Sequence, residues 1–129
     1  MIECFKNKKS PRLFDEGKRW DYDLLQIETL RQLAEDSDHV IITQHSAVRL
    51  LERNISYEDV LTAIATGEII EQYPDDYPHP SCLILGVTIA EKRLHVVCGT
   101  DMVYLWIITA YYPSIEKWES DFKTRRKSI

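Results

Sequence analysis

The sequence predicts an α+β domain, with helices in the N-terminal half and an antiparallel sheet after them. Two patterns predict it. Between residues 21 and 66, apolar side chains recur at intervals of three and four, which is the period of an amphipathic helix. After residue 67, short runs rich in β-branched and aromatic residues are typical of strands. We therefore expect N-terminal helices packed on a meander of about four antiparallel strands, followed by a short C-terminal helix.

The chain is long enough for one hydrophobic core and short for two. Its 129 residues are 44% hydrophobic and 29% charged, which is the composition of a folded globular protein. Residues 1–20 show no clear periodicity and are interpreted as an N-terminal arm. Residues 21–129 are then a single domain with a basic C-terminal tail.

The longest apolar run, at residues 103–110, is far shorter than the roughly 20 residues that span a bilayer. The basic N-terminal residues have no apolar run behind them, unlike those of a secretory signal. We expect a cytoplasmic protein without a membrane segment.

Two helices are predicted before residue 56. The first begins at Asp21 or Asp23, either of which is a suitable N-cap, and ends near Glu35. A short β-branched run follows at 39–43. Thr43 is then a suitable N-cap for the second helix, "TQHSAVRLLERNI".

The clearest boundary is the start of a helix near residues 57–66. Ser56 and Asp59 have the spacing of a capping box, in which each side chain binds the backbone N–H of the other residue. At the far end, Gly67 stands where a left-handed C-terminal residue is expected.

Four runs of strand-forming residues follow this helix. The linkers at 91–92 and near 100–101 are too short for a parallel crossover, so they predict antiparallel hairpins. The segment "PDDYPHPS" is expected to form a structured loop. Pro113 and Ser114 then end the last strand and start a short amphipathic helix that includes Trp118. The four runs are residues 68–73, 81–90, 93–100 and 102–112.

Charge is distributed unevenly along the chain, whose net charge is −5. Residues 1–20 contain six Lys or Arg against three Asp or Glu, and residues 121–129 contain four against one. Residues 21–120 contain six basic and seventeen acidic residues. An acidic body repels a nucleic acid at long range. A nucleic-acid site therefore requires a local cationic patch or the two ends.

His45, Arg49 and Arg53 lie four residues apart in the second predicted helix. Each step of four drifts by only about 40° around a helix, so the three side chains share one face. We call them the His/Arg row. Apolar residues such as Leu50 and Leu51 gather on the opposite side, so the row is expected to face solvent. It can be a phosphate-binding cluster or a solvated polar face.

On the second interpretation, the arginines are neutralised by nearby carboxylates. Arg49 then pairs with Glu52, and Arg53 pairs with Glu52 or Asp59. Such exposed ion pairs contribute at most about 1 kcal/mol.

A string of segments in order carries a resemblance that covers about residues 24–119. The segments are His45-x-Ala47-x-Arg49-x-x-Glu52-Arg53-x-Ile55, Glu58-Asp59-Val60, Gly67-x-Ile69-Ile70-Glu71-x-Tyr73-Pro74, Pro78-x-Pro80-Ser81-x-Leu83-x-Leu85-Gly86, Leu94-His95-Val96-Val97 and Ile107-Ile108-Thr109-x-Tyr111-x-Pro113. They resemble an uncharacterised small bacterial domain family that is grouped with the RelE/ParE-like toxins. The resemblance implies helices packed on a curved antiparallel sheet. That fold includes messenger-RNA endonucleases, gyrase poisons and members with no assigned role, so it does not select a function.

One interpretation is a toxin of the toxin–antitoxin type that cleaves messenger RNA without a metal ion. Such cleavage needs a base for the ribose 2′-hydroxyl, a cation for the phosphorane and an acid for the leaving oxygen. RNA or the ribosome, and an antitoxin-like protein, are then the expected partners. The candidate catalytic residues are His45, Arg49, Arg53, His95 and Tyr111, and the candidate substrate-binding residues are Arg93 and Thr109.

The alternative is a non-catalytic protein-interaction module of the same fold. In that case His95 is a structural strand residue, and Tyr111 is an aromatic residue at the rim of the core. Neither interpretation needs a cofactor. The scattered cysteines and histidines lack the spacing of a metal site, and Cys82 and Cys98 lie in apolar runs that are typical of free buried thiols.

Overall fold

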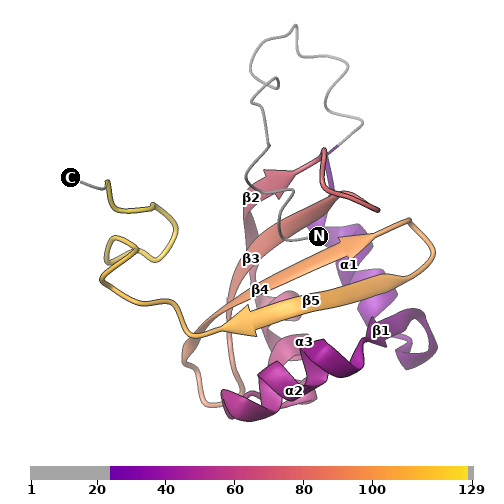
Figure 1. The fold of residues 1–129 in the computed structure, drawn as a ribbon, viewed down its shortest axis with the longest axis horizontal. Coiled ribbons are helices and arrows are strands. Elements are labelled where there is room, and N and C mark those ends of the chain that lie inside the picture. Colours follow the sequence, from indigo (N-terminus) through magenta and orange to yellow (C-terminus); the bar gives the residue numbers. More distant parts are fainter. Residues whose placement is uncertain (1–23, 128–129) are drawn as a thin grey trace, which may run out of the picture.

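The computed structural model describes residues 24–127, and its architecture is α+β, as predicted. The predicted arm at residues 1–20 lies outside the described residues, as do Asp21 and Asp23. Figure 1 shows the elements in chain order. They are α1 (Ile27–Ala34), the 3-10 turn η4 (Ser37–His39), β1 (Val40–Ile42), α2 (Gln44–Glu52), α3 (Tyr57–Thr66), β2 (Glu68–Tyr73), β3 (Ser81–Val87), β4 (Arg93–Thr100) and β5 (Leu105–Tyr111).

The sheet has five strands in the order β1-β5-β4-β3-β2 and is mixed. Strands β2 to β5 form the predicted antiparallel meander. The prediction of about four strands, all antiparallel, is wrong at one edge. There β1 pairs in parallel with β5, from Val40 opposite Leu105 to Ile42 opposite Ile107. Parallel pairing needs a long connection, and here α2, α3 and three strands lie between the two partners.

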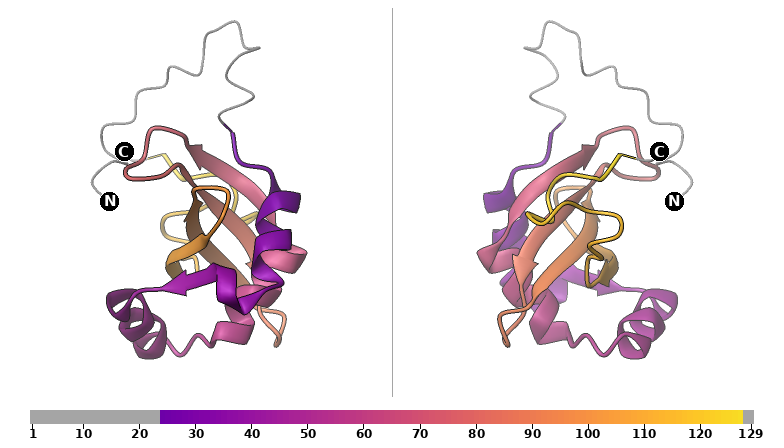
Figure 2. Two further views of the ribbon diagram at one scale, coloured as in Figure 1. Left: turned by 90° about the vertical axis from the view of Figure 1, so that its right-hand side faces the viewer. Right: turned by 90° about the vertical axis from the view of Figure 1, so that its left-hand side faces the viewer.

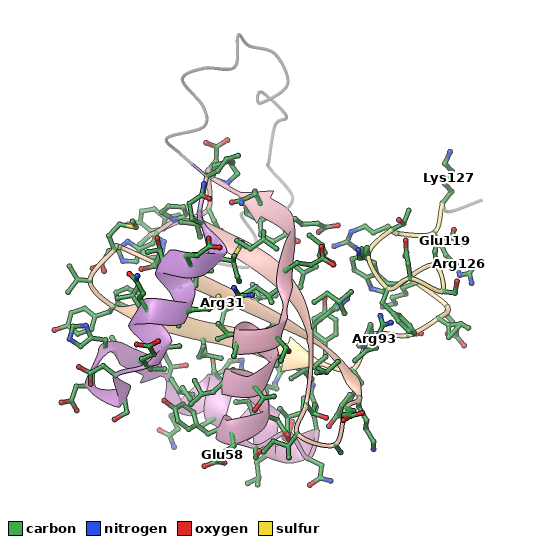
Figure 3. All side chains as sticks on the ribbon, turned by 180° about the vertical axis from the view of Figure 1, so that it is seen from behind. Arg31, Glu58, Arg93, Glu119, Arg126 and Lys127 are labelled. Atoms are coloured by element: carbon green, nitrogen blue, oxygen red, sulfur yellow. The ribbon has the colours of Figure 1, made fainter. Side chains whose placement is uncertain are left out.

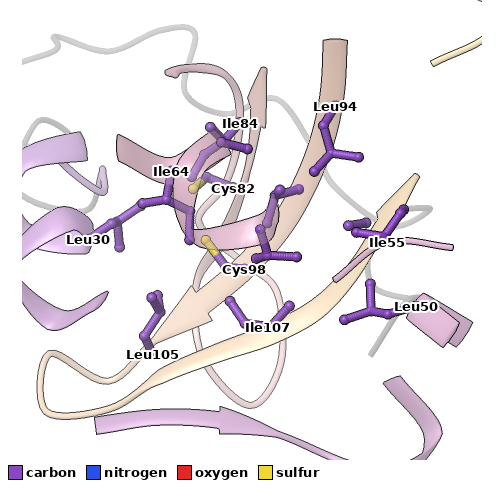
Figure 4. Packing of buried hydrophobic residues seen from close by; sticks show 14 of the residues in the cluster. Leu30, Leu50, Ile55, Ile64, Cys82, Ile84, Leu94, Cys98, Leu105 and Ile107 are labelled. Atoms are coloured by element: carbon purple, nitrogen blue, oxygen red, sulfur yellow. The ribbon is translucent and has the colours of Figure 1, made fainter. Parts of the chain in front are cut away.

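Helices α1 and α3 cover one face of the sheet and enclose the main core (Figures 2 and 4). Leu30 of α1, Ile64 of α3 and Ile84 of β3 are all fully buried in it. Each such side chain contributes roughly 1.5–3 kcal/mol by leaving water. Cys82 and Cys98 face one another across β3 and β4 as buried free thiols, which confirms that expectation.

Helices α2 and α3 begin where the sequence predicts. The Thr43 hydroxyl accepts a hydrogen bond from the Ser46 N–H at 3.2 Å. Ser56 and Asp59 form the predicted capping box, with bonds of 3.0 and 3.3 Å. Each cap satisfies helix N–H groups that have no partner within the helix.

The predicted start of the first helix near residue 21 is wrong. Helix α1 begins at Ile27, with Gln26 at its N-cap and no side-chain cap. The cause lies in Leu25, whose N–H and carbonyl both bind the side-chain amide of Gln72 in β2, at 3.0 and 2.9 Å. This tie holds the backbone before α1 against the edge of the sheet, so the helix cannot start earlier.

Gly67 does not adopt the predicted left-handed conformation, because its φ of −96° and ψ of −177° are extended. The chain passes directly from α3 into β2 at this point and needs no reversal. Glycine is still required there, since a Cβ atom at residue 67 would lie 2.6 Å from the Leu85 carbonyl oxygen.

The predicted C-terminal helix is also wrong. Residues 113–127 form turns closed by one bridge between Trp118 and Arg125, and they cover the second face of the sheet (Figure 2). Trp118 is only 3% exposed. Glu71 of β2 accepts two hydrogen bonds from Arg125, at 2.8 and 3.0 Å. Asp121 binds two backbone N–H groups that follow it, and such local bonds compete with helix formation.

We predict that Gly86→Ala lowers the free energy of unfolding by about 1–3 kcal/mol, the usual cost of overpacking. A Cβ atom at residue 86 would lie 2.7 Å from the Cα atom of Ala63, so α3 would have to move away from β3. Chemical denaturation measures the loss. The matched control is Gly99→Ala, whose nearest heavy atom would lie 3.0 Å away, and it should lose less. Equal stability of the Gly86→Ala variant and the original protein would contradict this prediction.

Candidate functional site

Helix α2 lies beside the half of β5 that β1 does not reach (Figure 1). Strand β1 pairs with β5 only as far as Ile107. Beyond it, the Ser46 hydroxyl donates to the Ile108 carbonyl at 2.8 Å, and Arg53 donates to the Ala110 carbonyl at 2.9 Å. Buried carbonyls without a partner are costly. These two bonds therefore hold α2 at the edge of the sheet.

The orientation of α2 differs from the one predicted from its apolar residues. Leu50 is buried, but Leu51 is 79% exposed and Val48 is 44% exposed. In the His/Arg row, His45 and Arg49 are exposed, as predicted, but Arg53 turns towards β5, where it also donates to the Thr109 hydroxyl at 2.9 Å. The bonds to β5 thus decide which side of the helix faces the sheet.

A cavity of about 680 Å³ opens between α2, β5 and the loop that follows β2. A bulge in β5 shapes it. Thr109 pairs with Val97 and Ile107 pairs with Cys98, so Ile108 is an extra residue. Both Ile108 and Thr109 consequently line the cavity. The full lining is Thr43, His45, Ser46, Arg49, Arg53, Pro78, His79, Gly99, Trp106, Ile107, Ile108, Thr109 and Tyr111.

Five of the seven candidate site residues line this cavity. His45, Arg49 and Arg53 reach it from α2, and Thr109 and Tyr111 reach it from β5. The spacing in the sequence predicted the three helix residues as a group. Their meeting with β5 depends on the edge contact described above.

The lining is cationic in an acidic protein. It contains two arginines and two histidines and no Asp or Glu. The predicted ion pairs of Arg49 with Glu52 and of Arg53 with Glu52 or Asp59 do not form. Arg53 binds the sheet instead, and Arg49 has no hydrogen-bond or ion-pair partner within residues 24–127. The guanidinium of Arg49 is therefore available to an anionic ligand.

Other arginines are engaged elsewhere (Figure 3). Arg31 of α1 donates to the carbonyls of Ile64 and Gly67, at 3.2 and 2.8 Å. Arg126 of the C-terminal segment lies 3.4 Å from Glu119. These arginines serve the fold, whereas Arg49 does not.

His79 and Trp106 belong to the cavity, and the sequence did not identify them as site residues. The imidazole of His79 stacks on the indole of Trp106, with ring centroids 4.7 Å apart and planes at 23°. Hydrogen bonds from the Tyr104 and Val103 N–H groups lower the carboxyl pKa of Asp101, and His79 is close enough to add a smaller effect in the same direction. The only signal in the sequence is a histidine between two prolines in a loop.

His95 lies behind the cavity rather than in it. It is fully buried, and its Nε2 lies 2.8 Å from the Phe122 carbonyl oxygen, which can only accept a hydrogen bond. In the neutral ring Nδ1 must then accept, and it lies 3.4 Å from the Tyr111 hydroxyl. Burial lowers the pKa of His95, which favours this neutral form. His95 thus orients Tyr111 and has no access to a ligand in the cavity.

Tyr111 remains protonated, because burial raises the pKa of its hydroxyl. Its proton points at His95 Nδ1, so its oxygen is free to accept a hydrogen bond from a ligand. Arg53 is close enough to oppose part of the pKa shift.

Arg93, a candidate for substrate binding, does not line the cavity. It is exposed at the start of β4 and donates to the Asp121 carbonyl at 3.5 Å. Its guanidinium lies 5.7 Å from the ring centroid of Phe122. The bonds of Arg93 join β4 to the C-terminal segment.

Residues 24–127 contain neither a cluster of metal ligands nor a helix that could span a membrane. No three His, Cys, Asp or Glu side chains in this part of the chain lie together as metal ligands would. No helix in the same part has the length and apolar character needed to cross a membrane.

Comparison with known proteins gives a match to a family model. A family model described as a domain of unknown function (DUF4258) matches residues 42–112, which is more than half of the chain. The matched segment runs from the end of β1 to the residue after β5 and so includes every residue that lines the cavity. No curated protein and no solved structure matches the chain.

We predict that the two arginines differ in their effect on stability. Arg53→Ala should lower the free energy of unfolding by about 1–2 kcal/mol, because the Ala110 carbonyl loses a charged donor. Arg49→Ala should change it by less than about 0.5 kcal/mol, as expected for an exposed side chain without a partner. Urea denaturation of both variants tests this. Equal losses would show that the bonds of Arg53 to β5 add nothing.

We also predict that stability falls with acidification partly through His95. Because the folded-state pKa of His95 is lowered, its contribution is complete above the unfolded-state value of about 6.5. It is lost as the pH falls through the folded-state pKa. His95→Gln, which cannot become charged, should show a smaller decrease in the free energy of unfolding between pH 7.5 and 4.5. Identical decreases in both proteins would refute this assignment.

Proposed function

The chain belongs to the DUF4258 family of domains of unknown function. We propose that it cleaves RNA in the cavity between α2 and β5, by a reaction that uses no metal ion. One observation carries the proposal. His45, Arg49, Arg53 and His79 line a single cavity that contains no carboxylate. A polyanion can approach such a site even on an acidic protein, because the local potential is positive.

The proposed reaction needs two proton transfers and one charge stabiliser. His45, as base, takes the proton of the ribose 2′-hydroxyl, whose oxygen then attacks the adjacent phosphorus. His79, in its protonated form, donates a proton to the departing 5′-oxygen. The products are a 2′,3′-cyclic phosphate and a 5′-hydroxyl end. At the end of the step His45 is protonated and His79 is neutral.

The arginines stabilise the charge on the phosphorane. Arg49 has no partner among the described residues and is the residue proposed to grip the phosphate. Arg53 is already bound to Thr109 and Ala110, so it contributes a fixed positive charge that costs no reorganisation. The proposed role of the Tyr111 oxygen is to accept a hydrogen bond from the 2′-hydroxyl of a neighbouring ribose, because His45 takes the proton of the attacking one.

The proposal includes the grouping with RelE/ParE-like toxins. The resemblance of the segments in the sequence supports it, and helices on one face of a sheet agree with it. On this view the substrate is messenger RNA, free or on the ribosome, and an antitoxin-like protein is the partner. The proposed location is the cytoplasm.

A second candidate function is a protein-binding module without catalysis. It is favoured by one observation, the exposure of Leu51 and Val48 on the outer side of α2. Apolar side chains exposed side by side are common at protein interfaces. Binding of a partner protein is compatible with both candidates, so only the chemistry separates them.

We predict that the purified protein converts single-stranded RNA to fragments with 2′,3′-cyclic phosphate ends in the presence of a chelator, with or without added ribosomes. His45→Ala and Arg49→Ala should each lower the rate by at least about 100-fold, the usual contribution of an acid–base group or of an electrostatic stabiliser. Mass spectrometry of the fragments gives the products.

The matched control is Arg93→Ala, which removes an exposed arginine outside the cavity lining. Its cleavage rate should equal that of the original protein. Absence of cleavage by the original protein under every condition would exclude the nuclease proposal and leave the binding module.

A further inference from the structure

Part of the cavity lining is aromatic. Trp106 and His79 stack there, and Tyr104 contacts the indole edge-on, with centroids 6.0 Å apart and planes at 67°. Pro78 and Gly99 line the same part of the cavity. Gly99 lies opposite Trp106 in the strand pairing and has no side chain to cover the indole. This surface contains no arginine or lysine that could bind a phosphate group.

The dimensions of the cavity also exceed what a phosphate requires. Its volume of about 680 Å³ lies within the range of roughly 300–1,000 Å³ that is usual for sites of small molecules. Its lining includes Arg49 and Arg53 together with the aromatic stack. A ligand that contacts both groups of residues has an anionic group and a flat apolar ring. A nucleotide has that combination.

The loop that carries His79 is held in place before any ligand binds. The Ser81 hydroxyl donates to Asp76 at 2.6 Å, and the Tyr77 N–H donates to the same carboxyl group at 3.0 Å. Asp76 is only 6% exposed and Ser81 is fully buried. The Thr100 N–H donates to the Pro80 carbonyl at 3.2 Å, which ties the loop to the end of β4. A preformed surface binds without the entropic cost of ordering the loop.

We propose that the Trp106–His79 stack binds an unpaired nucleobase of an RNA strand whose phosphate lies at Arg49 and Arg53. This inference rests on the proposed function and gives its substrate class. A base within a duplex has both of its faces covered by neighbouring bases, so it cannot stack on a protein ring. The site therefore takes single-stranded RNA and excludes duplex RNA.

The test measures binding separately from cleavage. The probes are two short 2′-O-methyl RNA strands, identical except that one lacks the central base. Cleavage is blocked in both, because the methyl group replaces the attacking 2′-hydroxyl proton. Fluorescence anisotropy should give about 5- to 150-fold tighter binding of the strand that carries the base, the range expected for stacking on one aromatic side chain.

Three variants locate the effect. Trp106→Leu should abolish the preference for the base while leaving the affinity for the abasic strand unchanged. Trp106→Phe should keep most of the preference, because it keeps a ring. Tyr112→Leu is the matched control, since Tyr112 is 40% exposed and lies outside the cavity lining, and it should change neither affinity. Circular dichroism of each variant confirms that it is folded.

Each outcome decides between the two proposals. Equal binding of both strands by the original protein overturns the stacking site, and so does a preference that survives in Trp106→Leu. A loss of affinity for both strands in that folded variant also overturns it, because the indole then only shapes the cavity. A base preference without cleavage of unmodified RNA leaves the stacking site standing and removes the nuclease. Cleavage of unmodified RNA without a base preference leaves the nuclease proposal standing and removes the stacking site. Absence of binding to either strand overturns both.

Discussion

On the side away from β4, the backbone of β5 beyond Ile107 has no strand beside it, and the site depends on how the carbonyls on that side are satisfied. Helix α2 satisfies them through the side chains of Ser46 and Arg53. This requirement brings a polar face of the helix to the sheet and leaves Leu51 in solvent. A purely apolar contact would have turned the helix the other way and left no cationic cavity. A hydrogen-bonding demand of the backbone thus creates the site.

The cavity and the C-terminal segment are connected through one histidine. His95 accepts the hydroxyl proton of Tyr111 on the cavity side and donates to the carbonyl of Phe122 in the C-terminal segment. Trp118 of that segment contacts the imidazole edge-on, with centroids 4.5 Å apart. The C-terminal segment is itself bound to β2 by the Arg125–Glu71 pair. The hydroxyl that faces the ligand is therefore positioned by residues of the C-terminal segment, which packs on the same face of the sheet.

Some charged side chains pair with one another and support the fold, whereas Arg49 is available to a ligand. Two basic residues of the C-terminal segment, Lys123 and Arg125, meet carboxylates of β2. In the Lys123–Glu68 contact of 2.8 Å, both side chains are about half exposed, so the pair contributes little to stability. The acidic excess of the body is thus partly balanced away from the cavity. Arg49 remains without a partner in the described part of the chain, within a lining that contains no carboxylate. No carboxylate of the lining therefore competes with an entering anion for the guanidinium of Arg49.

The sequence by itself determined the local elements, because caps and periodicity act over a few residues. The Ser56–Asp59 box, the Thr43 cap and the antiparallel meander formed as predicted. It also grouped the His/Arg row, since helix geometry fixes that spacing. Only the tertiary structure decided that β1 pairs in parallel, that the C-terminal segment is not helical, that His95 is enclosed and that His79 joins the site. These outcomes depend on which distant groups satisfy one another's hydrogen bonds, and no local pattern of residues encodes that.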